Sequence, residues 1–443
     1  MKSARILLLS ILAISCAIVP ARAAVPIRLP VPQVQSYRSA SIVLAADATA
    51  RLSGAQIFIR AGLDRQTSAQ NGLAALVAQS ILLTPVRPSN LGLRDAVAAQ
   101  GGSVDFVIDG GFVRFYLEGI AGAFERALVP LFATALAHPN FEPVMLAQAR
   151  AELDAKIADD QKIPLTVGLE MLNASFFTGS NAGLPPYGLP GTLAQQSGTD
   201  AARFYAANYR SGGAVVSAVG AFANGGSQSL RSIVDALAPG SSDPVRVRIP
   251  ALRGSARRLV THRDIAVPWV VAQFPAPPLT SPDFGAMLVL ASFLERTTQD
   301  VAANPTITSA RFAERAVGSF YNFDERPASV VLYINGGLGD PTRPLSTALS
   351  VMQIFANSKL AGDIGKMKTI AAGSYLEGAS SLEDRAWLAG VFVSQGLTPD
   401  YAAHALQAIA DVRAADLQRV ARGYLANPTL AVVLPRDTNA SQN

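Results

Sequence analysis

The chain alternates short runs of period-two hydrophobicity with longer stretches in which apolar residues recur every three or four positions. The first pattern is typical of strands and the second of helices. In the first half the pattern predicts strands at Ser41–Ala46, Gln56–Ala61, Val104–Ile108, Val113–Leu117 and Ala214–Val219, and helices at Asn71–Leu83, within Ala121–Phe177 and at Thr199–Tyr209. The turn Asp109-Gly110-Gly111 between two of these strands predicts a β-hairpin.

The second half repeats the same order of elements. The pattern predicts strands at Arg258–Thr261, Val267–Phe274, Gly318–Phe323, Ser329–Asn335 and Leu430–Leu434, and helices at Phe284–Arg296 and Ala414–Tyr424. Each half closes with a helix ending in a tyrosine, Tyr209 or Tyr424, followed by a polar turn and a β-branched strand. The recurrence predicts a duplicated α+β domain. Chance similarity of two Ala-rich helices is the alternative.

Turn-forming residues divide the chain near Ala238–Pro244. We therefore expect a first domain over residues 24–238, a linker over 239–256, a second domain over 257–437 and a short tail over 438–443. With 443 residues and 50% hydrophobic content, each half is long enough to bury its own core.

Residues 1–23 have the pattern of a secretory signal. Lys2 and Arg5 precede the apolar run Ile6–Val19, and Ala21-Arg22-Ala23 supplies small residues at the positions that a signal peptidase reads. The sequence thus predicts a cleaved signal and a protein located in the bacterial periplasm or secreted. Two alternatives are a retained anchor, for which the 14-residue run is short, and lipidation at Cys16.

Removal of that signal lowers the formal charge from +5 to +2. A nearly neutral chain gives no electrostatic reason to expect nucleic acid as a partner. Cys16 is the only cysteine and lies inside the signal, so the mature chain can form no disulfide and offers no thiolate.

Histidine count excludes the local zinc motifs. His138, His262 and His404 stand more than a hundred residues apart, so no H-x-x-E-H or H-E-x-x-H helix can form. No serine has the flanking glycines of a nucleophile elbow, and no lysine follows a serine at the S-x-x-K spacing.

Several segments, taken in order, resemble insulinase/pitrilysin-type zinc peptidases, the family that includes mitochondrial processing peptidase. The matching segments are Ala61-Gly62-Leu63-Asp64, Asn71–Thr84, Pro186–Thr192, Val215–Phe222, Gln273–Pro277 and Asp363–Leu425. The resemblance implies two homologous domains of the metallohydrolase type, each with a mixed sheet covered by helices, arranged as a clamshell.

The chain departs from this family at the zinc helix. Ala75, Ala78 and Gln79 stand where the family has its two zinc-binding histidines and the glutamate that acts as general base. Glu152 is the carboxylate nearest to the place of the third ligand. A carboxylate without nitrogen ligands would hold zinc poorly, so we expect Glu152 to be solvated or paired and the chain to carry no metal.

The resemblance further implies a pair of homologous subunits, of which one carries zinc and the other contributes an arginine and a tyrosine that hold the substrate backbone. Arg315 and Tyr321 are the candidates for substrate binding, with Arg311 as a rival for the arginine. A guanidinium can donate paired hydrogen bonds to carbonyl groups, and a phenol can donate one to an oxyanion. The alternative is that Tyr321 is a core residue and Arg315 a surface charge.

Three hypotheses for function follow. The first is an inactive, substrate-binding subunit of a periplasmic heterodimeric zinc peptidase, with zinc in the partner and peptide or unfolded polypeptide as substrate. The second is a stand-alone peptide-binding or scaffold protein of the same fold. The third is an enzyme that uses a site without a recognisable motif.

Overall fold

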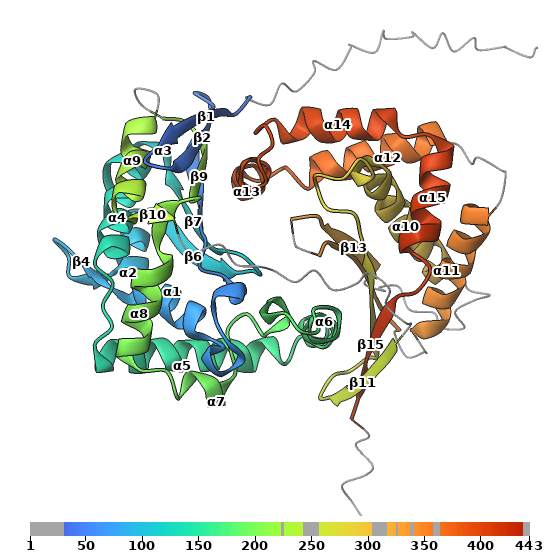
Figure 1. Ribbon diagram of the computed structural model, residues 1–443, viewed down its shortest axis with the longest axis horizontal. Helices are drawn as coiled ribbons and strands as arrows, with labels where there is room; N and C mark the ends of the chain where they lie inside the picture. Colours follow the sequence, from blue (N-terminus) through green and yellow to red (C-terminus); the bar gives the residue numbers. More distant parts are fainter. Residues whose placement is uncertain are drawn as a thin grey trace, which may run out of the picture. The chain divides into compact units, whose positions relative to one another are not determined.

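Two mixed β-sheets, one from each half of the chain, organise the fold (Figure 1). The structure is a computed structural model that describes residues 31–222, 226–241, 257–303, 317–324, 327–336, 341–357 and 364–436. The predicted signal (1–23) and tail (438–443) therefore lie outside the described residues.

The first half contains the larger sheet and the helices that follow its strands. Its strands are β1 (Gln33–Tyr37), β2 (Ala40–Ala46), β3 (Leu52–Ile59), β4 (Pro85–Val86), β5 (Leu91–Gly92), β6 (Gly102–Ile108), β7 (Val113–Ile120), β8 (Arg210–Gly212), β9 (Val215–Gly220) and β10 (Ala238–Ser241). Its helices are α1 (Leu73–Leu83), α2 (Leu93–Ala98), α3 (Ala121–Ala123), a π-helical turn at Phe124–Leu128, α4 (Val129–Ala137), α5 (Pro143–Asp160), α6 (Pro164–Phe176), α7 (Pro190–Leu193), α8 (Gly198–Asn208) and α9 (Ser227–Asp235).

The second half is built in the same way. Its strands are β11 (Arg257–Arg263), β12 (Trp269–Pro275), β13 (Val317–Asn322), β14 (Ser329–Asn335) and β15 (Thr429–Pro435). Its helices are α10 (Phe284–Ala303), α11 (Thr342–Asn357), α12 (Ile364–Glu377), α13 (Leu382–Ser394), α14 (Tyr401–Asp411) and α15 (Ala414–Tyr424).

The two sheets have the same topology. The first has the order β1-β2-β9-β3-β7-β6 and the second β11-β15-β12-β14-β13, so β2 corresponds to β11, β9 to β15 and β3 to β12. Strand directions agree as well, because within these two sheets β2–β9 and β11–β15 are the parallel pairs and the other pairs are antiparallel. The predicted duplication and the predicted α+β fold class are confirmed.

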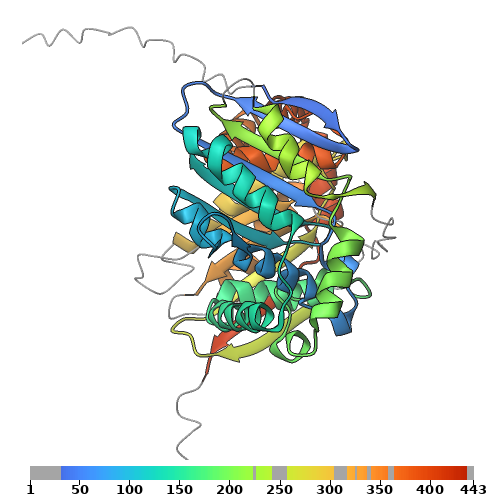
Figure 2. The ribbon, with the colours of Figure 1, turned by 90° about the vertical axis from the view of Figure 1, so that its left-hand side faces the viewer.

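Alternation along the strands decides which side chains enter each core. In β3, Ala55, Ile57 and Ile59 pack into the core of the first half, beneath the helices that Figure 2 shows on the near side of the molecule. Helix α1 is buried at every position, and all of its residues except Gln79 and Ser80 are apolar. Residues on the opposite face of β3, among them Gln56 and Phe58, point away from that core.

One helix of each half packs against the sheet of the other half. Helix α13, from the second half, packs on β2, β3 and β9, whereas α6, from the first half, packs on β11, β12 and β15. A glycine makes each contact close, because a Cβ on Gly390 would lie 2.3 Å from the ring of Phe58 and one on Gly168 would lie 2.6 Å from Val271. The exchange follows the repeat, since the strands contacted are equivalent.

Replacement of Gly390 by Ala is expected to loosen α13 from the first sheet. Overpacking against a fully buried ring lowers the free energy of unfolding by about 2 kcal/mol. The better helix propensity of Ala offsets nearly half of this, so we expect a net loss of stability of about 1 kcal/mol. Urea unfolding of Gly390→Ala and of Gly168→Ala measures both contacts. Unfolding midpoints equal to that of the unmodified chain would show that the glycines are not needed for the exchange.

The strand and helix predictions agree with the structure at most positions. Ser329–Asn335 and Ala414–Tyr424 have the predicted bounds, and the hairpin around Asp109-Gly110-Gly111 joins β6 to β7. Part of the predicted linker is a strand instead, because Ala238–Ser241 pairs in parallel with β8. The Ala238 N–H donates to the Tyr209 carbonyl oxygen, which holds these residues against the first half.

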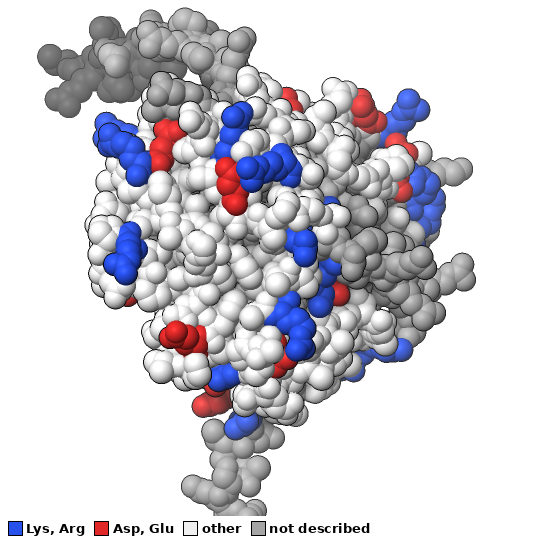
Figure 3. Space-filling view, turned by 60° about the vertical axis from the view of Figure 1, so that its left-hand side comes forward, with Lys and Arg blue, Asp and Glu red and all other residues white. Residues whose placement is uncertain are grey.

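The charge on one face of the molecule and the length and apolar character of its helices both bear on the class of protein. On the face in Figure 3, Lys and Arg side chains lie singly or beside Asp and Glu, and most of the face is uncharged. Within the described part of the chain, none of the helices has the length and apolar character needed to cross a membrane.

Candidate functional site

Helix α1 carries the positions at which the resemblance placed a zinc site. Gly72 precedes the helix in the left-handed conformation, at φ +95°, and its approach to Gly188 leaves no room for a side chain at either glycine. Ala75 and Ala78 are fully buried. Gln79 is 4% exposed and points toward helix α5. The segment thus has no imidazole or acid at the three family positions.

Gln79 and Glu152 are brought together, as the resemblance implied for the positions they occupy. The Gln79 side-chain N–H donates to Glu152 Oε2 at 2.5 Å. Arg94, from α2, donates to the same oxygen at 2.9 Å, and its second terminal nitrogen lies 3.4 Å from Gln79 Oε1. Gln148, one turn earlier on α5, donates to Glu152 Oε1 at 3.1 Å. Glu152 is therefore paired, which was one of the two outcomes expected for it.

This group, which we call the Arg94 cluster (Gln79, Arg94, Gln148 and Glu152), does not fit a zinc ion. Its one carboxylate is already bonded to a guanidinium and two amides, and it offers no nitrogen ligand. Among the residues that the structure describes, no group of three or more His, Cys, Asp and Glu side chains could hold a metal ion. The Arg94 guanidinium supplies the positive charge that balances Glu152.

Removal of the Glu152 carboxylate is expected to cost stability. Glu152→Ala leaves the buried Gln79 amide without its acceptor and Arg94 without its counter-ion, at a cost of about 1 to 2 kcal/mol for partly exposed groups. Asp154, exposed on the same helix, provides the control, and Asp154→Ala should be close to neutral. Equal unfolding midpoints for the two variants in urea would mean that the cluster contributes nothing to the fold.

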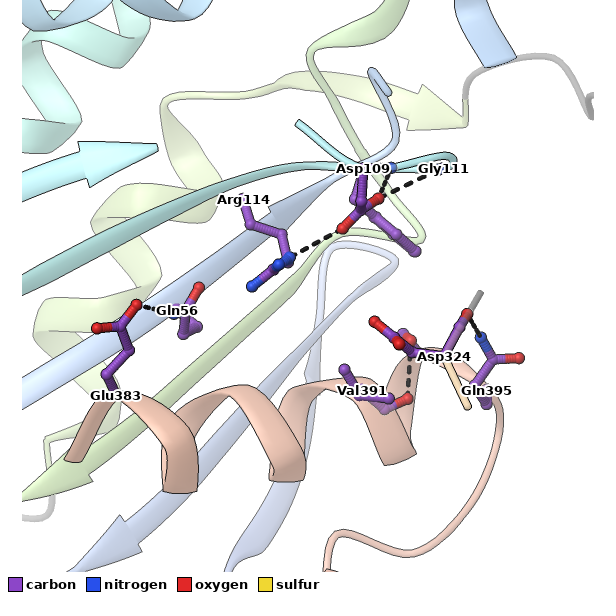
Figure 4. Close-up of polar contacts among 10 residues, drawn as sticks. Gln56, Asp109, Gly111, Arg114, Asp324, Glu383, Val391 and Gln395 are labelled. Carbon is purple, nitrogen blue, oxygen red and sulfur yellow. Dashed lines mark hydrogen bonds and ion pairs between the residues drawn. The ribbon is translucent and has the colours of Figure 1, made fainter. Parts of the chain in front are cut away.

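A second acidic group lies in the loop between β3 and α1. The Asp64 N–H donates to Gly110 O at 2.9 Å, so the loop rests against the β6–β7 hairpin. Burial raises the pKa of Asp64 to about 6, the Asp109 charge adds to the rise, and Arg65 and Arg60 oppose it. The Asp109 carboxylate is engaged by Arg114 Nε at 2.8 Å and by the N–H groups of Gly111 and Phe112 (Figure 4).

The predicted substrate-binding residues are described only in part. Arg315 and Arg311 lie outside the described residues. Tyr321 lies in β13, where its ring packs against Phe284 and Phe323 and its hydroxyl donates to the Pro277 carbonyl. Burial raises the pKa of the Tyr321 phenol far above its ordinary value. To contact a substrate, Tyr321 would have to release Pro277, so its role in binding stays a prediction.

The first sheet ends in strand β6, whose outer edge pairs with no described strand. Val104, Phe106 and Ile108 of β6 enter the core of the first half. Ser103, Asp105 and Val107 are exposed on the opposite face of the sheet, the face on which α13 packs, which we call the inner face. An edge of this kind can accept an additional strand from an extended peptide. The inner face continues across β7 with Arg114, Tyr116 and Glu118.

Sequence reasoning missed Arg94 and the polar groups of this inner face. Arg94 lies 15 positions after Gln79, beyond the spacing at which residues of one helix meet, and the contact exists because α2 packs beside α1. The alternation of Ser103, Asp105 and Val107 was a usable signal, because three exposed positions facing one way in a strand indicate a face that is open.

The sequence matches no family model and no curated protein. Solved structures share the fold at low identity. A protease from Helicobacter pylori is 16% identical with a TM-score of 0.75, covering 92% of this chain and 100% of that one. The peptidase M16 inactive domain from Pseudomonas fluorescens is 13% identical with a TM-score of 0.75, covering 92% of this chain and 98% of that one.

A chain of complex III2 from Candida albicans is 14% identical with a TM-score of 0.73, covering 92% of this chain and 98% of that one. At such identities the likeness establishes the fold alone. The chain has the duplicated α+β fold found in M16-type peptidases, the class that its sequence resembles.

Proposed function

We propose that the chain is a catalytically inactive homologue of M16-type peptidases that binds extended peptide on behalf of a homologous subunit carrying zinc. The observation behind this proposal is the Arg94 cluster, in which a guanidinium and two amides satisfy Glu152 where the resemblance expects a metal with its ligands. Hydrolysis of a peptide by this class needs a metal-bound water and a general base, and these residues provide neither.

Retention of the fold around the altered residues supports a binding role. Helix α1 keeps its buried position between the sheet and α5, and the β6 edge remains open to an added strand. Backbone hydrogen bonds along such an edge give affinity for many sequences, and the side chains on its inner face select among them. Arg315 and Tyr321 are proposed to hold the substrate backbone from the second half.

Location and partner belong to the same proposal. The signal-like pattern of residues 1–23 supports a location of the mature chain in the periplasm or outside the cell. The partner is a homologous subunit with an intact H-x-x-E-H helix, so zinc is expected there and not in this chain.

Metal content and assembly test the proposal. The mature chain, its homologue with the intact motif and an equimolar mixture are analysed for zinc by mass spectrometry and for molecular mass by light scattering. We expect no stoichiometric zinc in the chain alone, one zinc per homologue, and a heterodimer in the mixture. Stoichiometric zinc in the isolated chain would refute the inactive reading. Two separate monomers would leave a stand-alone peptide-binding protein as the alternative.

A further inference from the structure

At one edge of the second sheet, β11 pairs with β15 and with no other described strand (Figure 1). Its counterpart in the first sheet is β2. The two sheets can be aligned residue by residue, because Phe58 in β3 and Val271 in β12 each meet the glycine of the exchanged helix. The strand pairings that lead outward from these two residues place Ile42 of β2 and Val260 of β11 at equivalent positions.

These equivalent residues differ in exposure. Ile42 is 1% exposed, whereas Val260 is 49% exposed. In the first half, α9 packs on β2, β9 and α4, and its residues Leu230, Ile233 and Val234 belong to the same buried cluster as Ile42. An apolar position that a helix covers in one half is thus open in the other.

The described part of the second half contains no counterpart of α9. In the first half α9 follows β9, whereas β15 is the last element of the described residues. Residues 437–443, which come next, contain no large apolar side chain. They therefore cannot cover Val260 in the way that α9 covers Ile42.

The open position belongs to a small apolar face. Arg258, Val260 and His262 point to the same side of β11, because alternate residues of a strand share a face. Leu430 and Leu434 of β15 pair with Arg258 and His262, and both leucines are only partly buried where they pack against the apolar core of the second half. We call these five residues the β11 face.

Charge on the β11 face limits what can bind there. Arg258 and His262 are exposed on either side of Val260, and Asp264 lies beyond the end of the strand. A second copy of β11 would place like charges opposite one another, which opposes the pairing of two such edges. A helix with carboxylates beside its apolar residues would instead complement the cations.

The other neighbour of α9 is also matched in the second half. In chain order the counterpart of α4 is α11, which has no charged residue after Arg343. An apolar helix beside α11 would therefore bury no charge of that helix beyond its first turn.

We propose that the β11 face docks an amphipathic helix of a partner protein, in the place that α9 has in the first half. The docked helix carries apolar residues at positions i, i+3 and i+4, as α9 does with Leu230, Ile233 and Val234, and acidic side chains toward Arg258 and His262. The proposal does not depend on the peptide-binding role, because the β11 face lies on the opposite side of the second sheet from α6.

Peptide binding measured by fluorescence anisotropy tests the proposal. Three labelled peptides of about 20 residues, long enough to form a helix in part, are titrated with the mature chain. The first has Leu, Ile and Val at the α9 spacing and Glu at the polar positions, the second has Lys in place of Glu, and the third has the composition of the first in shuffled order. We expect the first peptide to bind about tenfold tighter than the other two, and added salt should weaken its binding.

Val260→Asp locates the site, and Val34→Asp is its matched control. Val34 is 45% exposed in β1, the edge strand of the first sheet. We expect Val260→Asp to weaken binding of the first peptide about tenfold and Val34→Asp to leave it unchanged, with both midpoints of urea unfolding close to that of the unmodified chain. Binding that survives Val260→Asp, or no binding of the first peptide, would overturn the proposal.

Two other occupants of the β11 face give different results. A second copy of the chain would produce a dimer in light scattering that Val260→Asp separates. Residues 242–256 of the same chain, which lie outside the described residues, would make the urea midpoint fall in Val260→Asp and not in Val34→Asp. Either result would overturn the docking of a partner helix.

Discussion

Asp64→Asn is expected to stabilise the chain by about 2 kcal/mol at pH 8 and by almost nothing at pH 3. Burial raises the native pKa of Asp64 to about 6, against an ordinary value of 3.8. The folded state therefore binds a proton that the unfolded state releases between these values, and its stability falls as the pH rises through that range. A carboxyl with this pKa costs roughly 3 kcal/mol when ionised, and Asn recovers most of it.

Urea unfolding at pH 3, 5 and 8 measures this dependence, with Asp154→Asn as an exposed control that should change little at any pH. The groups facing Asp64 are Asp109, Arg65 and Arg60. Asp109 raises the pKa of Asp64, whereas Arg65 and Arg60 lower it. A gain of stability that is the same at pH 3 and pH 8 would show that the effect of the substitution is unrelated to ionisation of Asp64.

Gly285→Ala should destabilise the fold by about 3 kcal/mol, the largest loss that we predict. Gly285 lies in the first turn of α10, where a Cβ would stand 2.2 Å from the carbonyl oxygen of Ala408 in α14. The obstructing atom belongs to the backbone of a helix, so no side-chain rotation can relieve the overlap. Either α14 must move or the cluster of apolar side chains between the two helices must open.

Gly373→Ala is the matched control. Gly373 is exposed in α12 and a Cβ there would meet no atom within 4 Å, so the same substitution should add about 0.5 to 1 kcal/mol through helix propensity alone. The midpoints of urea unfolding should therefore move in opposite directions. A loss in both variants would mean that the close contact of α10 with α14 is not the cause.

Much of the fold could be predicted because the signals were local. The turn Asp109-Gly110-Gly111 between two alternating runs predicts the β6–β7 hairpin. The helices α8 and α15, which precede the last large strand of each half, end at or beside the predicted tyrosines. Repetition added long-range information, because a second copy of an element order implies a second copy of a sheet. The sheet order itself, with β9 between β2 and β3, needed the structure.

The exchange of α6 and α13 could not be predicted from the pattern. Both helices have ordinary apolar residues, and periodicity shows that a face is buried without showing what buries it. Gly168 and Gly390 were the available hints, since a glycine inside a helix often marks a close approach. Neither glycine indicates that the approaching sheet belongs to the other half.

The parts of the candidate site that depend only on which residue stands at a position could be predicted from the sequence. Loss of the histidines and the glutamate follows from reading Ala75, Ala78 and Gln79, and the pairing of Glu152 was one of the expected outcomes. The residue that balances the charge of Glu152 was not predictable, because Arg94 belongs to a separate short helix. The carboxylates on the inner face come from β6, β7 and α13, and only tertiary structure brings them together.

These features agree with the proposed function, in which the duplicated fold binds peptide without holding a zinc ion. The Arg94 cluster occupies the positions at which the resemblance expects a metal site. The inner face of the first sheet offers acceptors beside an open strand edge. In the proposed function, the chain binds peptide and a partner subunit performs the cleavage.

The most direct test is the rate at which a quenched fluorescent peptide library is cleaved by the zinc-bearing homologue with and without this chain. The chain alone should cleave nothing, and its addition should raise the homologue's rate severalfold. Arg315→Ala and Tyr321→Phe should reduce that gain. Cleavage by the chain alone, in a preparation free of the homologue, would contradict the proposal that it is the inactive, substrate-binding member of the pair.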